Sequence, residues 1–208
     1  MEASAPLAPH IEPEPREWQL RALWVGARML CGAASFFFMA FLFAYFYLRS
    51  LDVNKNWKIG HVTAPTGWGI VIVVVLVASA VLLRMASRQP TSALPLGSAA
   101  LGLALLSIVL QVITWTTLGF GPASGGYASV YVGWTAWYAV FTLACAYWIE
   151  TQIASVWRLS KEGVQRPRRE GVPSDDVELL GAGLEACSFF WAFYVATGVI
   201  AFVVLYLV

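Results

Sequence analysis

The histidines and carboxylates that could bind a metal or relay protons lie outside the interior of the long apolar stretches of this chain. Both histidines, His10 and His61, lie in polar segments, whereas a helix bundle that holds haem through imidazole needs histidines within its apolar segments. Asp and Glu are absent from the interior of these stretches, so no row of carboxylates is available to relay protons or bind a cation at mid-membrane. We predict that the chain has no catalytic residues and no cofactor or metal site.

The three cysteines do not suggest a metal site or a disulfide framework. Cys31, Cys145 and Cys187 each lie in an apolar stretch, and none belongs to a CxxC pair. Such cysteines are typical of small packed side chains. The serine and threonine hydroxyls of the apolar stretches have no His or Lys nearby in sequence that could activate a nucleophile. We therefore assign them to helix packing.

Four residues are candidates for contact with lipid or with a partner protein. Arg28 and Glu185 lie just inside the ends of two apolar stretches, where a charged group can reach the membrane interface or bind a lipid headgroup. Ser98 and Gly102 belong to a group of small residues, which allow another helix to approach closely within lipid.

The elements that would position these residues are membrane-spanning helices. Twenty consecutive uncharged residues lie between Arg28 and Arg49, and at 1.5 Å per residue they span roughly the 30 Å hydrocarbon core. In lipid, a single segment satisfies its own backbone only as a helix. Aromatic residues surround this helix, so periodicity assigns it no buried stripe. Tyr45 and Tyr47 lie near its end, where an aromatic belt is expected.

Further charge-free windows predict four more spans. The window from Gln89 to Ile149 is too long for one crossing, and the breaker GFGPASGG at 119–126 divides it. The predicted spans are about 24–48, 67–87, 94–118, 127–157 and 183–207. We expect an all-α bundle of five transmembrane helices over 22–208, with a flexible extramembrane tail at 1–21 and a polar cytoplasmic loop at 158–181.

Composition supports a membrane protein. The chain of 208 residues is 59% hydrophobic and only 12% charged, about half the usual ~25%. So few charges cannot cover the surface of a soluble globule. The net charge of +1 excludes a broad basic surface for nucleic acid.

The distribution of basic residues predicts the orientation. With five spans, one side carries ten basic residues and the other carries three. The ten are Arg16, Arg21, Arg28, Arg84, Arg88, Arg158, Lys161, Arg166, Arg168 and Arg169; the three are Arg49, Lys55 and Lys58. Because basic residues favour the cytoplasmic side, we expect a cytoplasmic N-terminus and a C-terminus outside.

Two apolar stretches resemble a known family. RMLCGAASFFFMAFLFAYFYLR, from Arg28, resembles the first of the five shared helices of subunit III of haem–copper respiratory oxidases, in which an Arg and a Phe-rich run precede an aromatic-Ala-aromatic-Tyr pattern. GLEACSFFWAFYVATGVIAFVVLYL, from Gly183, is similar to the closing helix of that family, which begins Gly-Leu-Glu and ends in an aliphatic Leu-Tyr run.

Three further stretches match this family in the same order. They are Pro65 with Ala78 and Ser79, Gln111 with Trp115, and YASVYVGWTAWY from Tyr127, which resembles a Tyr-Gly-Ser-x-Phe-Phe-x-x-Thr-Gly-x-His signature. The resemblance covers roughly residues 22–208 and corresponds to a five-helix form without the first two helices of the seven-helix version. In that version the two helices form a V-shaped cleft that holds phospholipid, so here another subunit has to supply the second wall.

The resemblance implies an accessory subunit of a proton-pumping cytochrome c oxidase in aerobic electron transport. Such a subunit has no redox centre and stabilises the catalytic subunit through helix packing and bound phospholipid. The implied partners are the catalytic haem–copper subunit I and the copper-binding subunit II, which carry the haem and copper, and cytochrome c through the complex. The implied location is the plasma membrane of a bacterium.

The departures from the family replace polar residues with apolar or aromatic ones. Ala34 stands where the family has a buried Glu, Tyr138 and Phe141 where it has histidines, and Thr114 where it has a Glu. The closing Trp-His-Phe-Val-Asp becomes FWAFY at 190–194. This pattern favours a packing role over a chemical one.

Three alternatives stay open. Two are the equivalent subunit of a quinol oxidase and the related subunit that accompanies nitric oxide reductase. The third, of another class, is a small transporter or channel of unrelated fold.

Overall fold

The computed structural model describes residues 15–53, 57–58, 62–89, 93–165 and 174–208, and this part of the chain contains five long helices and no strand. The helices are α1 (Arg16–Ser50), α2 (Thr66–Arg88), α3 (Ala93–Thr116), α4 (Gly126–Gln165) and α5 (Ser174–Phe202), and α5 continues into a π-helical turn, η2 (Val203–Leu207). All five are long and apolar enough to cross a membrane. The chain is therefore an all-α integral membrane protein.

The helices extend beyond several of the predicted spans. α1 begins at Arg16, so 16–21 of the expected tail is helical. The expected loop at 158–181 is helical at both ends, and the connection that remains, 166–173, lies outside the described residues. A charge-free window measures the length that crosses lipid, whereas a helix continues into water where Lys, Glu, Gln and Arg favour it. The 1–14 segment of the predicted tail also lies outside the described residues.

The predicted break at 119–126 separates α3 from α4. Gly125 adopts a φ of 131°, a backbone conformation that glycine adopts without steric cost. The first residue of α4 is also a glycine, and a Cβ on Gly126 would lie 2.9 Å from the ring of Trp57. The backbone N–H of Tyr127 donates to the carbonyl oxygen of Trp57 at 3.0 Å. The turn thus fastens the start of α4 to the connection between α1 and α2.

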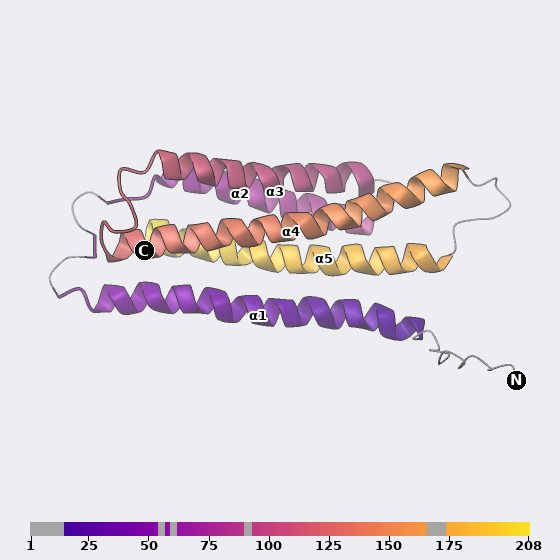
Figure 1. Ribbon diagram of the computed structural model, residues 1–208, viewed down its shortest axis with the longest axis horizontal. Coiled ribbons are helices and arrows are strands. Elements are labelled where there is room, and N and C mark those ends of the chain that lie inside the picture. Colours follow the sequence, from indigo (N-terminus) through magenta and orange to yellow (C-terminus); the bar gives the residue numbers. More distant parts are fainter. Residues whose placement is uncertain (1–14, 54–56, 59–61, 90–92, 166–173) are drawn as a thin grey trace, which may run out of the picture.

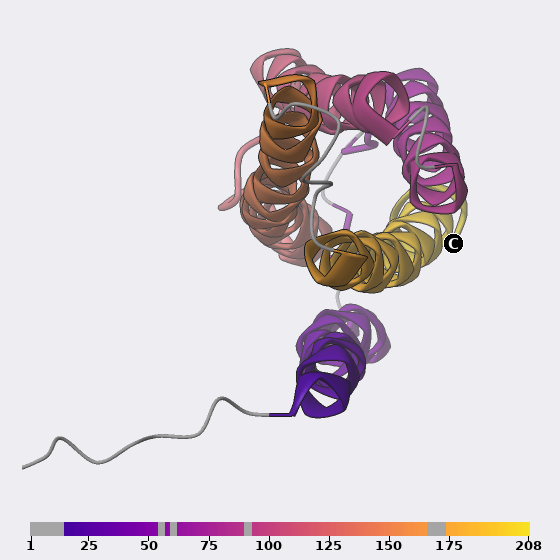
Figure 2. The ribbon, with the colours of Figure 1, turned by 90° about the vertical axis from the view of Figure 1, so that its right-hand side faces the viewer.

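Four of the helices form a ring, and the fifth lies outside it. Viewed along the bundle, α2, α3, α4 and α5 follow one another around the ring, each in contact with the next (Figure 2). α1 runs alongside the ring, against α5 and α4 (Figure 1). Consecutive helices run in opposite directions, so the N-terminus of α1, the C-terminus of α2 and the N-terminus of α5 lie at one end (Figure 1).

α1 has a buried stripe that its aromatic sequence does not reveal. Ala27, Ala34, Phe38 and Tyr45 are buried, at alternating intervals of seven and four residues, whereas Phe36 is 83% exposed. The expectation of an aromatic belt at Tyr45 is wrong because its ring is completely buried and packs edge-on against Trp57, with centroids 5.1 Å apart.

The interior of the ring is filled largely by aromatic side chains. The largest fully buried ones that α4 and α5 contribute are Tyr127, Tyr131, Trp134, Trp191 and Tyr194. Small residues of α3 complete the packing, since Ala100 and Ala104 have no exposed surface. Close packing of this kind stabilises helices in lipid through van der Waals contact.

Candidate functional site: a cleft between α1 and α5

An open cleft of about 670 Å³ lies between the N-terminal parts of α1 and α5, with Ser87 of α2 also in its lining. Arg21, Trp24 and Arg28 line it from α1, and Glu178 and Glu185 line it from α5. Two of the four predicted contact residues, Arg28 and Glu185, therefore share one cleft. These residues lie at the end of the bundle where polar sequence gives way to apolar sequence, so the cleft belongs to the membrane interface.

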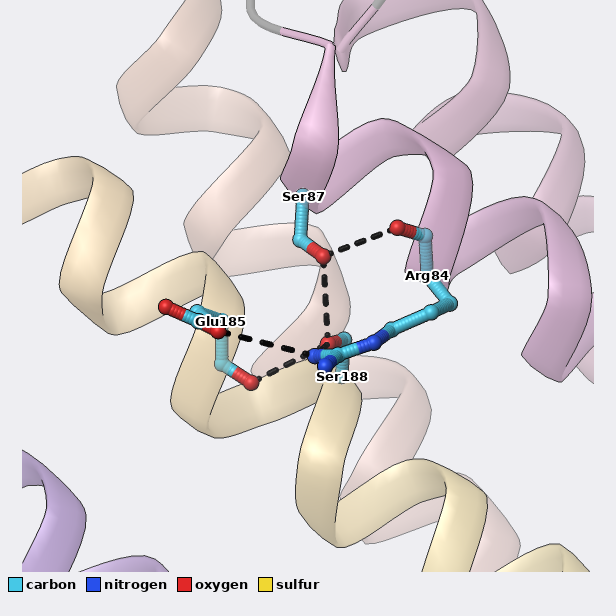
Figure 3. Close-up of polar contacts among 4 residues, drawn as sticks. All are labelled: Arg84, Ser87, Glu185 and Ser188. Atoms are coloured by element: carbon cyan, nitrogen blue, oxygen red, sulfur yellow. Dashed lines mark hydrogen bonds and ion pairs between the residues drawn. The ribbon is translucent and has the colours of Figure 1, made fainter.

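The carboxylate of Glu185 is part of a polar cluster that joins α5 to α2 (Figure 3). Its Oε1 lies 3.8 Å from Nη1 of Arg84. The same Nη1 donates to the hydroxyl of Ser188 at 3.2 Å. The Ser188 oxygen lies 3.0 Å from the carbonyl oxygen of Glu185 and 3.3 Å from the hydroxyl of Ser87. Ser87 in turn donates to the carbonyl oxygen of Arg84 at 2.9 Å.

The ion pair within this cluster orients the side chains of Arg84 and Glu185 and contributes little to the free energy of folding. The side chains of Arg84 and Glu185 are 37% and 46% exposed. Water and salt screen such pairs, which contribute about 0–1 kcal/mol. The fully buried hydroxyl of Ser188 fixes the geometry, since it accepts from the guanidinium and lies one turn from Glu185.

Arg28 has an aromatic neighbour and, among the described residues, no carboxylate partner. Its guanidinium carbon lies 5.9 Å from the centre of the Trp24 ring, within range of a cation–π contact. Trp24 in turn packs against Phe189 of α5, with ring centroids 5.7 Å apart. The tryptophan therefore holds the exposed arginine beside the cleft, where its donors remain available to an anion.

The other acidic residue of the cleft is paired across the two helices. Nε of Arg16 lies 3.3 Å from Oε2 of Glu178. Both cleft carboxylates thus have an arginine partner, Glu178 with Arg16 and Glu185 with Arg84. Among the described residues, Arg21 has an exposed contact of 3.9 Å with Glu17 and no other ion pair. Arg21 and Arg28 line the cleft while its two carboxylates pair with Arg16 and Arg84, so these two guanidinium groups can bind a phosphate through paired hydrogen bonds.

Ser98 and Gly102 do not belong to this cleft. Both are exposed on the outer face of α3, and a Cβ on Gly102 would meet no atom within 4 Å. The glycine of α3 that does permit close approach is Gly97, where a Cβ would lie 3.0 Å from Ile153 of α4. Small-residue packing within the chain therefore uses another face of α3, and contact of Ser98 and Gly102 with lipid or a partner stays a prediction.

The sequence prediction missed Arg84, Ser87 and Ser188 as members of the polar cluster. A usable signal existed, because Arg84 closes the second charge-free window and Glu185 opens the last one. Residues of opposite charge at the same depth on antiparallel helices are candidates for pairing. The two serines carried no separate signal.

An apolar groove lies beside Ala34. Ala34 is 5% exposed. It lines a groove of about 320 Å³ between α1, α4 and α5, together with Phe37, Phe141, Cys145 and Trp148. Ser35 donates to the carbonyl oxygen of Cys31 at 2.8 Å, one turn back in α1. The groove therefore offers a buried carboxylate no hydroxyl or basic partner among its lining residues.

Metal-binding side chains do not gather anywhere in the described part of the chain, where no group of three His, Cys, Asp or Glu could hold an ion. In comparisons with known proteins, neither a family model nor a curated protein matches the chain.

Proposed function

We propose that this chain is an accessory subunit without a redox centre, corresponding to subunit III of a cytochrome c oxidase complex in a bacterial plasma membrane. Support comes from the five stretches that resemble this family in order over roughly residues 22–208 and from the five apolar helices. In this role the chain stabilises the catalytic subunit through helix packing and bound lipid, while haem, copper and electron transfer belong to the partner subunits.

The main structural support for a packing role is that side chains fill the interior of the helix ring. Tyr138 and Tyr194 stack across it with ring centroids 4.5 Å apart. The cavity nearest the ring axis measures about 50 Å³, far below the ~300–1,000 Å³ of typical ligand sites. This geometry favours a supporting subunit over a carrier, which needs a solute-sized site near the bilayer midplane.

The cleft between α1 and α5 is the proposed phospholipid site of this subunit. Arg28 and Arg21 supply guanidinium donors for the phosphate, and Trp24 lies at the interface, where tryptophan is favoured. Because the basic residues favour a cytoplasmic N-terminus, the bound lipid belongs to the cytoplasmic leaflet. A lipid held here fills space that α1 and α5 leave between them and so supports the contact of α1 with the ring.

Copurification tests the main proposal. An affinity tag on this chain, followed by mild solubilisation in detergent, is expected to recover a haem–copper subunit in fixed ratio, whereas the chain isolated from its partners shows no Soret band and no stoichiometric copper or iron. A chain that purifies alone and moves a solute in proteoliposomes contradicts the proposal, as does a haem in the isolated chain. If the purified complex oxidises quinol and not cytochrome c, the electron donor differs from the one proposed, but the accessory role of this chain stands.

The amount of lipid phosphorus retained per chain tests the proposed phospholipid site in the cleft. The Arg28→Gln variant is expected to retain about one phospholipid fewer per chain after delipidating washes. Arg88→Gln is the matched control, because Arg88 is an exposed arginine at the same end of the bundle that does not line the cleft. Equal lipid content in the two variants contradicts the assignment of Arg28.

A further inference from the structure

Inside the helix ring, a small cavity brings together polar side chains from α3, α4 and the C-terminal turn. Its volume is about 50 Å³, and Gln111, Trp134, Thr135, Tyr138 and Tyr206 line it among apolar side chains. A second cavity of about 10 Å³ shares Gln111 and Tyr138 with the first and extends to Ser107 and Thr142. The two cavities therefore adjoin at Gln111 and Tyr138, and each brings a few polar groups together within a mostly apolar lining.

One hydrogen-bond donor at this cavity, Nε1 of Trp134, has no acceptor among the described protein atoms and is shielded from outside solvent. Nε2 of Gln111 is equally shielded and makes no hydrogen bond of ordinary geometry, although the Gln111 side chain lies close enough to the Tyr131 hydroxyl to interact with it. Trp134 as a whole is only 1% exposed. A buried N–H without an acceptor is strongly disfavoured, so native proteins almost always supply one, as a protein group or an ordered water.

The neighbouring polar groups already have protein partners. Trp115 donates through Nε1 to the hydroxyl of Thr135 at 3.0 Å, and Thr135 donates to the carbonyl oxygen of Tyr131 at 2.8 Å. The hydroxyls of Tyr131 and Tyr206 lie 2.7 Å apart. These contacts leave Nε1 of Trp134 without a protein acceptor among the described atoms, and Nε2 of Gln111 with only the nearby hydroxyl of Tyr131.

The residues that line the two cavities indicate which kind of molecule can occupy them. No Asp, Glu, Lys, Arg or His is among the residues that line either cavity, so an ion has no counter-charge there and remains in water. A water molecule needs about 10–15 Å³ and two to four polar partners. The larger cavity thus has room for roughly three to four waters and the smaller one for about one.

We propose that this cavity is a water-binding site within the membrane span, in which ordered waters accept from Nε1 of Trp134 and Nε2 of Gln111. The waters also bridge Tyr138 to the hydroxyl pair of Tyr131 and Tyr206. The resulting hydrogen-bonded connection runs from Thr142 to the π-helical turn η2 and links α3, α4 and the end of α5. This proposal stands independently of the oxidase assignment.

Two glycines shape the site. A Cβ on Gly69 would lie 2.8 Å from the ring of Tyr206, and a Cβ on Gly198 would collide with the hydroxyl of Tyr138. Both glycines line the cavity. Their lack of a side chain lets the two tyrosines sit beside the polar groups that the waters bridge.

Water contact at the indole N–H tests the proposal directly. The full chain, labelled with ¹⁵N at tryptophan Nε1 and placed in lipid nanodiscs, is studied by water-edited NMR, and Trp134→Phe assigns the resonance. The Trp134 N–H is expected to receive magnetisation from water. Trp191 is the matched control, since it is equally buried and its Nε1 donates to the hydroxyl of Ser79 at 3.1 Å; it is expected to receive none.

A second variant keeps the test decisive if Trp134→Phe does not fold. Gln111→Leu removes one of the donors and places an apolar side chain at the cavity. It is expected to reduce the transfer of magnetisation from water to the buried indole N–H that receives it in the unaltered chain, and to leave the Trp191 signal unchanged. A cryo-EM map of the unaltered chain at a resolution that shows waters provides an independent check. Absence of water transfer to any buried indole, or binding of xenon in the cavity, shows that it is dry and overturns the proposal.

Discussion

Tyr138 of α4 and Tyr194 of α5 exchange hydrogen bonds, each hydroxyl donating to the backbone carbonyl oxygen of the other residue. The distance from the Tyr138 hydroxyl to the Tyr194 carbonyl is 3.0 Å, and the two rings stack with centroids 4.5 Å apart. Both residues stand at positions where the resembled family has polar side chains. Here they fasten two helices, with the hydroxyl of Thr142 also 3.0 Å from that of Tyr194.

Removal of the Tyr194 hydroxyl is expected to destabilise the bundle. Tyr194→Phe keeps the stacked ring but loses the contacts with the Tyr138 carbonyl and with Thr142, at a cost of about 1 kcal/mol in the free energy of unfolding. Thermal unfolding in nanodiscs measures this loss. Tyr147→Phe is the control because Tyr147 lies on the same helix as Thr142 and is 69% exposed; equal stability of the two variants contradicts the prediction.

The glycines that face tyrosines are expected to resist substitution. Gly69→Ala or Gly198→Ala places a methyl group against Tyr206 or Tyr138, and overpacking of this kind costs about 1–3 kcal/mol. Gly102→Ala is the matched control, since a Cβ there meets nothing within 4 Å, and alanine favours the helix by up to about 1 kcal/mol. Unfolding in a denaturant series ranks the three, and an equal loss in all of them shows that close approach is not the cause.

The sequence predicted the number of helices well, because charge-free windows of membrane length report directly on what lipid tolerates. The ends of the helices were less accurate because Arg16 and Gln165 are compatible with helix in water. The arrangement of helices could not be predicted, since the aromatic residues of α1 surround it and only contact with α4 and α5 selects Ala34 and Phe38 as its buried side. Arg28 and Glu185 were identified individually, but their meeting in one cleft depends on that arrangement.

A carboxylate at position 34 is expected to weaken assembly without raising turnover. Ala34 is buried beside Phe37, Phe141 and Trp148, so Ala34→Glu has to stay protonated or cost a few kcal/mol. The measurements are the amount of intact complex recovered and its turnover. Ala34→Gln separates size from charge, because it has nearly the same volume and does not ionise.

Carbodiimide labelling examines the same position in the unaltered protein. α1 has no acidic residue between Glu17 and its C-terminal end, so the apolar part of α1 is expected to remain unlabelled. Label in that part, or faster sustained turnover in the Ala34→Glu complex, is evidence against a packing role for this position.

The excess of basic residues on one side is expected to set the topology. A reporter fused after Val208 should be exported, and one inserted at Gly171, within the connection at 166–173 that lies outside the described residues, should stay in the cytoplasm. Paired alkaline phosphatase and green fluorescent protein fusions distinguish the two sides. Export at Gly171 together with retention at Val208 reverses the orientation of every helix.

The position of α1 beside the last helix has a consequence for biosynthesis. α1 leaves the ribosome before the other four helices, yet its partner rings on α5, Phe189 and Tyr194, are made only after α2, α3 and α4. At roughly 5–20 residues per second this interval is on the order of ten seconds. During that time Tyr45 can pack against Trp57, and Phe38 can pack against Tyr138 and Phe141 once α4 is made, but the side of the buried stripe that faces α5 is covered only by lipid or by the insertion machinery. We expect α1 to dock last, so a nascent chain released before α5 emerges should leave α1 accessible to crosslinking and to membrane proteases.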